Sequence, residues 1–312
     1  MITLENVTKS YGRLYALREV SFTVPPGKIT GLLGPNGAGK TTALNLMTGY
    51  FPPDGGRVLV AGMDMAKRPG ECKRKIGYLP EKPPLYDEMT VWDYLCFVCD
   101  LRDVLPGGRA RHVEEILSIC GLEGERGRVI GHLSKGFRQR VGIAQALCGN
   151  PEILILDEPT VGLDPRQVVE IRELIRALAQ DHTILFSSHI LSEVQQLCDS
   201  AIILHEGRMI RSLDLKGPEG SGQVRMKIRA RGKEKELMPA IRSIACVRKV
   251  ETLPGAAPGE AVLRIIGLEK DERGLLTDQL FHLLAAVDAP LREMTPERDE
   301  LETLFLQATE KE

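Results

Sequence analysis

A glycine-rich octapeptide at residues 34–41 has the residue types and spacing of a phosphate-binding loop. It follows an apolar run at residues 29–33 and opens a helix-prone stretch at residues 42–48. Its glycines allow successive backbone N–H groups to converge on a triphosphate, and the following helix points its positive end at the same anion. Lys40 adds a charge near the β and γ phosphates, and Thr41 offers a hydroxyl to Mg²⁺. An ordinary strand-to-helix turn is the alternative interpretation.

The residues that we predict to contact the nucleotide through this loop are Gly34, Pro35, Asn36, Gly37, Ala38, Gly39, Lys40, Thr41 and Thr42.

Two acids, Asp157 and Glu158, follow four apolar residues at 153–156. Ligands of open α/β sheets bind beyond the carboxyl ends of the strands. Asp157 can therefore face the Mg²⁺ beside Thr41, while Glu158 polarises an attacking water. Acids at a strand end can also be turn residues, but the phosphate-binding loop favours the catalytic interpretation.

Length and composition are those of a globular protein with about two domains, since the chain has 312 residues, 43% apolar content and 27% charge. The net charge of −2 gives no basic surplus, so nucleic acid is not an expected partner. No window approaches the roughly 18 apolar residues of a membrane span, and the first residues lack the plan of a signal peptide. We therefore expect a cytosolic chain.

The seven cysteines, an odd number scattered through apolar segments, suit reduced thiols better than a disulfide framework. Cys96 and Cys99 form a C-x-x-C pair inside a helical pattern. Zinc or redox chemistry would need a second pair or a histidine cluster at ligand spacing, and the sequence has neither. Packing inside a helix is the favoured interpretation.

The predicted secondary structure changes along the chain from strands to helices and back to strands. Residues 1–80 alternate short strands with Gly/Pro turns. Helical periodicity follows at residues 90–102, 109–120 and 134–147, which predicts a separate lobe at about 82–149. Strand patterns return at residues 153–156, 183–186 and 201–204, with a helix at 165–180 after the first. Such alternation implies a parallel sheet.

A linker at residues 216–222, Lys-Gly-Pro-Glu-Gly-Ser-Gly, predicts a boundary between a first domain at 1–214, which contains the loop and the two acids, and an accessory domain at 223–312. The second domain begins with a strand at 224–229, then a helix and strands at 247–251 and 261–266. A helix at 275–286, a strand and a terminal helix at 299–309 follow. This order resembles a ferredoxin-like βαββαβ fold of α+β class.

Residues 133–140, Leu-Ser-Lys-Gly-Phe-Arg-Gln-Arg, resemble the signature segment of ABC-type ATPases, usually written L-S-G-G-Q and followed by Q-R. The positions that match are Leu133, Ser134, Gly136, Gln139 and Arg140. Lys135 stands where the family usually has glycine, and Phe137 where it has glutamine. The position of the segment, ahead of the two acids, supports the resemblance.

Other landmarks of that family occur in the expected order. Tyr11 resembles the aromatic residue that stacks on adenine, although an exposed tyrosine at a strand end is the alternative. Glu81 ends a segment resembling the loop between core and lobe, where the family normally has glutamine. A carboxylate there can still reach Mg²⁺ or the attacking water, but it cannot donate a hydrogen bond. Residues 161–164 resemble the loop that crosses the dimer interface, and His189 resembles the histidine that contacts the γ-phosphate.

The resemblance implies an α/β P-loop NTPase of ABC type, with a parallel-sheet core, an antiparallel β subdomain and a helical lobe. It implies ATP and Mg²⁺ as ligands, with Thr41, Asp157 and Glu81 at the metal. The implied catalytic residues are Glu158, His189 and Glu81. In the family, two copies enclose two ATP molecules, and Ser134 and Gly136 contact the nucleotide held by the other copy.

The function implied by this resemblance is that of an ABC transporter's ATPase subunit, bound to a separate membrane subunit at the inner face of the membrane. The tail at residues 300–307 resembles exporter-type subunits with a small C-terminal domain. The alternative is a soluble ABC-type ATPase with a mechanical role in translation or repair, but such proteins usually carry tandem ATPase domains or a long coiled-coil insertion. A non-hydrolysing binding module is disfavoured by the presence of both Glu158 and His189.

Overall fold

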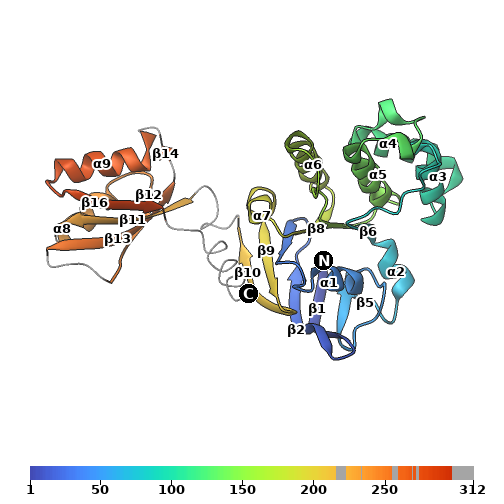
Figure 1. Ribbon diagram of the computed structural model, residues 1–312, viewed down its shortest axis with the longest axis horizontal. Coiled ribbons are helices and arrows are strands. Elements are labelled where there is room, and N and C mark those ends of the chain that lie inside the picture. The colour runs from blue at the N-terminus through green and yellow to red at the C-terminus, as the bar shows by residue number, and fades with distance from the viewer. Residues whose placement is uncertain (216–222, 233, 255–258, 269, 272–273, 297–312) are drawn as a thin grey trace. The chain divides into compact units, whose positions relative to one another are not determined.

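The computed structural model describes residues 1–215, 223–232, 234–254, 259–268, 270–271 and 274–296 (Figure 1). The chain divides into two compact units, Met1–Leu215 and Lys216–Glu312. Each unit has its own sheets and its own apolar core.

The first unit is built on a six-stranded sheet in the order β10-β9-β3-β8-β7-β6. Its strands are β3 (Ile29–Leu33), β6 (Ile76–Leu79), β7 (Ile153–Asp157), β8 (Thr183–Ser188), β9 (Ser200–His205) and β10 (Arg208–Asp214). All pairs are parallel except β10 with β9. Every residue of β3, β7 and β8 is buried, as in strands covered on both faces. The predicted parallel sheet is confirmed.

A second, antiparallel sheet has the order β2-β1-β4-β5. Its strands are β1 (Ile2–Tyr11), β2 (Leu14–Val24), β4 (Gly55–Val60) and β5 (Met63–Asp64). Their inward side chains, such as Leu4 and Val58, share one apolar cluster with Leu44 and Met47 of helix α1 (Lys40–Met47). The short helix α2 (Pro69–Arg74) contributes Cys72 to the same cluster. This core fixes α1 and the loop before it.

The helical lobe contains α3 (Val91–Leu101), α4 (Pro106–Cys120) and α5 (Lys135–Leu147), with two short 3₁₀ helices, Glu123–Glu125 and Ile130–His132. Helix α4 begins three residues before the predicted start, because Pro106 suits a first helical turn. It ends at Gly121 as expected. Cys99 is buried and Cys96 is half-buried, and none of the seven cysteines forms a disulfide.

Two further helices flank the parallel sheet. Helix α6 (Pro165–Leu178) is capped by Asp164, whose carboxylate accepts from two backbone N–H groups, and it ends two residues before the predicted end. Helix α7 (Leu191–Leu197) was not expected from the sequence. It approaches β3 closely, since a Cβ on Gly31 would lie 2.6 Å from a methyl carbon of Val194.

The second unit has an antiparallel sheet in the order β12-β13-β11-β16. Its strands are β11 (Gln223–Arg231), β12 (Val247–Thr252), β13 (Glu260–Leu268) and β16 (Leu291–Pro296), and β14 (Lys270–Asp271) pairs separately with β15 (Gly274–Leu275). Helices α8 (Glu234–Arg242) and α9 (Leu276–Ala286) pack on the sheet through Leu237, Ile241 and Leu280. The order of strands is that of a ferredoxin-like fold, as predicted. The predicted helix at 299–309 lies outside the described residues.

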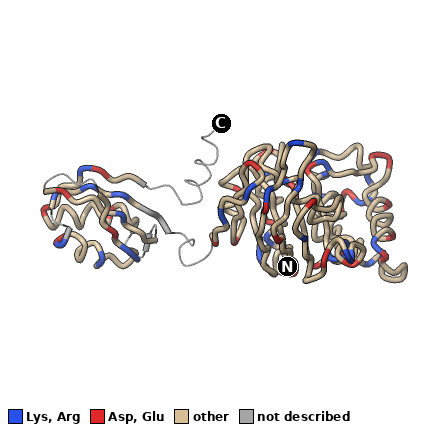
Figure 2. The backbone as a smooth tube through the Cα atoms, turned by 90° about the horizontal axis from the view of Figure 1, so that it is seen from below, with Lys and Arg blue, Asp and Glu red and all other residues tan. Residues whose placement is uncertain are grey.

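Acidic and basic residues are interspersed along the described chain, in keeping with the net charge of −2 (Figure 2). Within the described residues, no helix has both the length and the apolar character needed to cross a membrane.

Candidate nucleotide-binding site

The glycine-rich loop lies between β3 and α1, at the carboxyl end of the parallel sheet. Gly37 and Gly39 have positive φ angles of 81° and 101°. A Cβ on Gly39 would lie 2.5 Å from the carbonyl oxygen of Ala16, and one on Gly34 would lie 2.4 Å from that of Leu204. Only glycine satisfies these positions, so the loop has the conformation that its sequence predicts.

Lys40 is folded into this loop. Its Nζ donates to the carbonyl oxygens of Gly34 at 2.7 Å and Pro35 at 3.2 Å, and lies 3.6 Å from Oε1 of Glu158. Burial lowers the pKa of Lys40, and the carboxylates of Glu158 and Asp157 oppose that shift. Lys40 is only 7% exposed. Its ammonium group occupies the loop in which a phosphate would bind.

Asp157 is the last residue of β7 and is 2% exposed. Its Oδ1 accepts from the hydroxyl of Ser187 at 2.5 Å, and that hydroxyl accepts from the backbone N–H of Glu158 at 3.0 Å. Burial raises the pKa of the Asp157 carboxyl, and the carboxylates of Glu158 and Glu81 add to the rise. A buried carboxylate with so few hydrogen bonds is a suitable ligand for a cation.

Glu158 has a left-handed backbone, with φ at 47°. Such a conformation costs a non-glycine residue about 1–3 kcal/mol and is concentrated at functional sites. Its Oε2 lies 2.9 Å from Nδ1 of His189, which directly follows β8. The fold therefore pairs the predicted catalytic carboxylate with the predicted histidine, across 31 residues of sequence.

A pocket of about 540 Å³ joins Lys40, Asp157 and Glu158, and His189 is not among the residues that line it. Its lining includes residues 35–42 of the loop and α1, together with Glu81, Asp157 and Glu158. Thr41, Glu81 and Asp157, whose side chains all carry oxygen atoms, line the pocket. Mg²⁺ is usually bound by one or two carboxylates with waters and substrate phosphates. In the described part of the chain no cluster of three His, Cys, Asp or Glu side chains could hold a metal by itself. The donor set fits Mg²⁺ bound together with a nucleotide.

Tyr11, predicted to stack on adenine, does not line this pocket. Its ring packs edge-on against Phe51, with centroids 6.0 Å apart. Tyr15 on β2 lines the pocket instead, and the guanidinium of Arg18 lies 4.9 Å from the centroid of its ring. The sequence carries no signal that distinguishes these two exposed tyrosines of one hairpin.

The turn between β9 and β10 also borders the pocket through Glu206 and Arg208. It is attached to the loop, because the N–H of Gly207 donates to the carbonyl of Ala38 at 3.1 Å and the carbonyl of Gly207 accepts from Arg18 at 2.7 Å. A Glu-Gly pair between two strand patterns could have predicted this turn, but not its position beside the phosphate loop.

Ser134 and Gly136 lie outside the pocket. Ser134 is exposed and caps α5 by accepting from the N–H of Phe137. Gly136 is buried against α6, where its Cβ would lie 2.6 Å from Cδ of Gln167. A Cβ on Gly162 would lie 2.0 Å from Nζ of Lys135, so the signature segment contacts the loop at residues 161–164. Within one chain, neither predicted contact reaches the nucleotide pocket.

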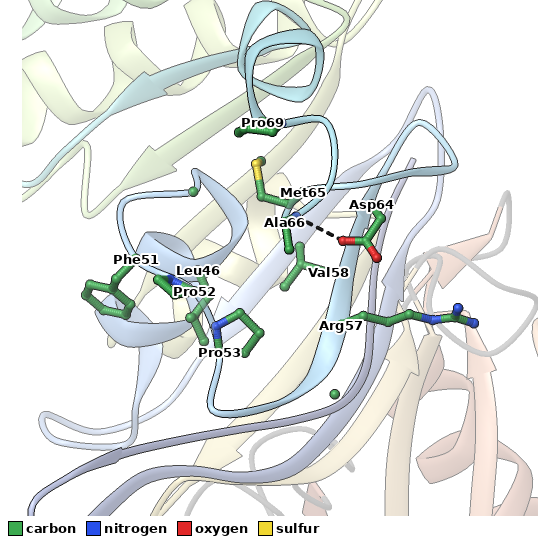
Figure 3. A pocket seen from close by; sticks show the side chains of 12 residues that line it. Leu46, Phe51, Pro52, Pro53, Arg57, Val58, Asp64, Met65, Ala66 and Pro69 are labelled. Carbon is green, nitrogen blue, oxygen red and sulfur yellow. Dashed lines mark hydrogen bonds between the residues drawn. The ribbon is translucent and has the colours of Figure 1, made fainter.

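A second pocket, of about 240 Å³, lies in the antiparallel subdomain (Figure 3). Its apolar lining comes from Phe51, Pro52 and Met65, and it has two ionisable side chains, Arg57 and Asp64. The Asp64 carboxylate accepts from the backbone of Ala66. None of the predicted site residues lines this second pocket. The 540 Å³ pocket beside the glycine loop is therefore the candidate active site.

The parallel sheet, the glycine loop and the acids at the carboxyl end of β7 define a P-loop nucleotide-hydrolysing protein. Residues 17–161 match the family described as ABC transporter. The chain is 39% identical to the bacitracin transport ATP-binding protein BcrA of Bacillus licheniformis over 68% of this chain and 69% of that protein. The chain therefore belongs to the family of ABC transporter ATP-binding proteins, and the sequence resemblance is confirmed.

Other relatives agree with this family. The linearmycin resistance ATP-binding protein LnrL of Bacillus subtilis is 35% identical over 80% of this chain and 81% of its own. The dimeric structure of MJ0796, a bacterial ABC transporter cassette, matches 70% of this chain and all of its own, with a TM-score of 0.64 and 28% identity. The same cassette has been solved in a post-hydrolysis state with ADP and Pi. The protein is an ATPase that binds ATP.

Proposed function

We propose that this chain hydrolyses ATP to power export through a separate membrane subunit, and that it works at the inner face of the membrane. The relatives are named for the transport of bacitracin and for resistance to linearmycin, which supports export. Those names do not favour the alternative of a non-transport mechanical ATPase. The observation that carries the proposal is the pocket that joins Lys40, Asp157 and Glu158.

In the proposed mechanism, Lys40 exchanges its carbonyl partners and Glu158 for the β and γ phosphates. Thr41, Asp157 and Glu81 would hold Mg²⁺, and a bound Mg²⁺ would supply positive charge beside the phosphate oxygens. Glu158 accepts a hydrogen bond from the attacking water and aligns it with the γ-phosphorus. His189 holds the Glu158 carboxylate in place and reaches toward the transferred phosphoryl group. Phosphoryl transfer needs little covalent participation by the protein. Catalysis therefore depends on positioning the reactants and on stabilising developing charge.

We propose that a second copy completes the site. Ser134 and Gly136 of the second copy would contact the nucleotide held by the loop of the first, so two copies enclose two ATP molecules. The exposure of Ser134 and its separation from the pocket of its own chain support this arrangement. The dimeric cassette among the structural relatives supports it too.

For docking to the membrane subunit, we propose the segment that contains Leu85 and Tyr86, beside the helical lobe. Tyr86 is 50% exposed, and its ring packs against Tyr94 and Phe97 of α3. This gives an aromatic surface fixed to the lobe, which could bind an apolar helix of a partner. We assign the accessory domain at 223–312 a role in dimer stability or coupling, separate from the ATPase domain at 1–214.

Glu158→Gln tests the catalytic part of the proposal. The amide keeps the shape but loses the charge that polarises water, so phosphate release should fall by about 10²-fold or more while ATP binding persists. Full turnover by this variant would contradict the proposal.

Co-purification from detergent extracts tests the transport part. The tagged full-length chain should carry an integral membrane protein with it, and a Leu85→Glu/Tyr86→Glu variant should not. Capture of soluble proteins alone would contradict a transport role.

A further inference from the structure

Glu193 is a buried carboxylate on α7 that the proposed mechanism does not use. It is 7% exposed, and its Oε2 accepts from the hydroxyl of Thr160 at 2.9 Å and from that of Ser188 at 2.8 Å. Both hydroxyl residues are themselves buried. No ion pair joins Glu193 to a basic residue of the described ranges. Burying a carboxylate on two hydroxyl donors is costly, so its position needs an explanation.

The two donors belong to the two turns that carry the catalytic pair. Thr160 lies in the turn after β7, which is closed by a hydrogen bond of 3.1 Å from the N–H of Val161 to the carbonyl of Glu158. The hydroxyl of Ser188 also accepts from the N–H of Ile190 at 3.0 Å. Ser188 and Ile190 enclose His189 between them. One oxygen atom of Glu193 therefore ties the turn of Glu158 to the turn of His189.

The position of Glu193 is set by how closely α7 approaches the sheet. Gly31 has no side chain, so Val194 packs directly over β3, and a Cβ at Gly31 would also lie 3.1 Å from the sulfur of Cys198. This contact fixes the part of α7 that carries Glu193, which directly precedes Val194.

We propose that Glu193 is a positioning residue for ATP hydrolysis: by holding both turns it keeps Glu158 and His189 at their 2.9 Å separation. The inference rests on the proposed roles of those two residues. Glu193 is not among the residues that line the nucleotide pocket, and its two hydroxyl donors, Thr160 and Ser188, lie outside the glycine loop. It should therefore affect the chemical step and leave ATP binding unchanged.

Steady-state ATPase kinetics of the full-length chain test this. Glu193→Ala should lower kcat by about tenfold or more with the KM for ATP within about twofold of wild type, because a misplacement of about 1 Å is enough for such a loss. Glu193→Gln should stay within about threefold of wild type, since its amide oxygen can accept from both hydroxyls. Equal losses for the two variants, or a rise in KM that matches the fall in kcat, would overturn the proposal.

A double-mutant cycle separates positioning from general stability. In a His189→Ala background, Glu193→Ala should cost about twofold or less in kcat, because the pair that it aligns is already gone. A fully additive loss would overturn the proposal.

If Glu193→Ala fails to fold, two other variants test the same contacts. Ser188→Ala and Thr160→Val each remove one of the two hydrogen bonds to Glu193 and should lower kcat without a matching rise in KM. Unchanged kcat in both variants would overturn the proposal.

The matched control is Asp199→Asn. The Asp199 carboxylate accepts from the N–H of Ile29 at 2.7 Å, at the end of β3 opposite the loop. This variant should lose stability but retain wild-type kcat. Failure of the proposed catalytic roles is distinguishable from failure of the Glu193 proposal. If Glu158 and His189 were not catalytic, Glu158→Gln and His189→Ala would keep full turnover, whatever the effect of Glu193→Ala.

Discussion

Replacing Asp157 by asparagine should stabilise the nucleotide-free protein while it abolishes hydrolysis. The carboxyl is 2% exposed, and its burial raises its pKa, as do the carboxylates of Glu158 and Glu81. The hydroxyl of Ser187 and the ammonium group of Lys40 oppose that rise without cancelling it. Without a bound cation, the folded protein therefore holds this charge at a cost.

The expected gain in the free energy of unfolding depends on which interactions of Asp157 the asparagine retains. Asparagine has nearly the same shape as aspartate, and its amide oxygen can still accept from Ser187. Replacing buried ionic groups by neutral ones of similar volume ranges from neutral to stabilising by ~4 kcal/mol, provided that no partner is left as an uncompensated buried charge. Lys40 keeps a carboxylate partner after the substitution, because its Nζ lies 3.6 Å from Glu158. Because Lys40 offsets part of the cost, we expect the free energy of unfolding to rise by about 1–2 kcal/mol.

The gain should also depend on pH. An acid whose pKa is raised by folding contributes stability that is fully present below its unfolded pKa, about 3.9, and that stability is lost as pH rises through the folded pKa. Wild type loses this contribution at neutral pH, whereas Asp157→Asn has no carboxyl to ionise. The difference between the two proteins should be largest near pH ~8 and shrink toward pH ~4.

Urea unfolding without nucleotide or Mg²⁺, followed by circular dichroism at several pH values, measures this difference. The control Asp199→Asn, which weakens a bond to the N–H of Ile29, should lower the midpoint instead. A midpoint for Asp157→Asn equal to or below that of wild type near pH ~8 would refute the reasoning.

Three further predictions concern binding. Lys40→Ala should weaken Mg-ATP binding by about 100-fold in calorimetry and also lower the urea midpoint, because Nζ bonds two loop carbonyls; unchanged affinity would contradict the assignment of the loop. Ser134→Arg should keep ATP affinity in the monomer but prevent ATP-dependent dimerisation, and a dimer seen by light scattering would argue against a site shared between copies. A chain truncated after Leu215 should still fold and bind ATP, since all pocket residues precede the linker; loss of ATP binding would show a shared core.

Local patterns were enough to predict the loop, the acids at the carboxyl end of β7 and the succession of strands and helices in the second unit. The conformation of the loop requires glycine at particular positions of the sequence. Gly37 and Gly39 have positive φ angles, which glycine adopts without steric cost. The parallel sheet followed from alternating strand and helix patterns, and the C-terminal strand order from its spacing of elements. These features need no knowledge of distant contacts.

Contacts between distant residues could not be predicted in the same way. The burial of Lys40 depends on carbonyls and carboxylates that meet it only in the folded chain. Which of two tyrosines in one hairpin faces the pocket depends on Phe51, which holds Tyr11 from outside the hairpin. Glu193 gave no signal at all, because its partners come from two other turns.

The most direct test of the account is the state of Glu158→Gln with Mg-ATP. If two copies enclose ATP and Glu158 activates the water, sedimentation should show a dimer that retains two uncleaved ATP molecules, while wild type turns over and returns to monomer. A monomeric Glu158→Gln protein, or a dimer whose bound nucleotide has become ADP at the wild-type rate, would contradict the account.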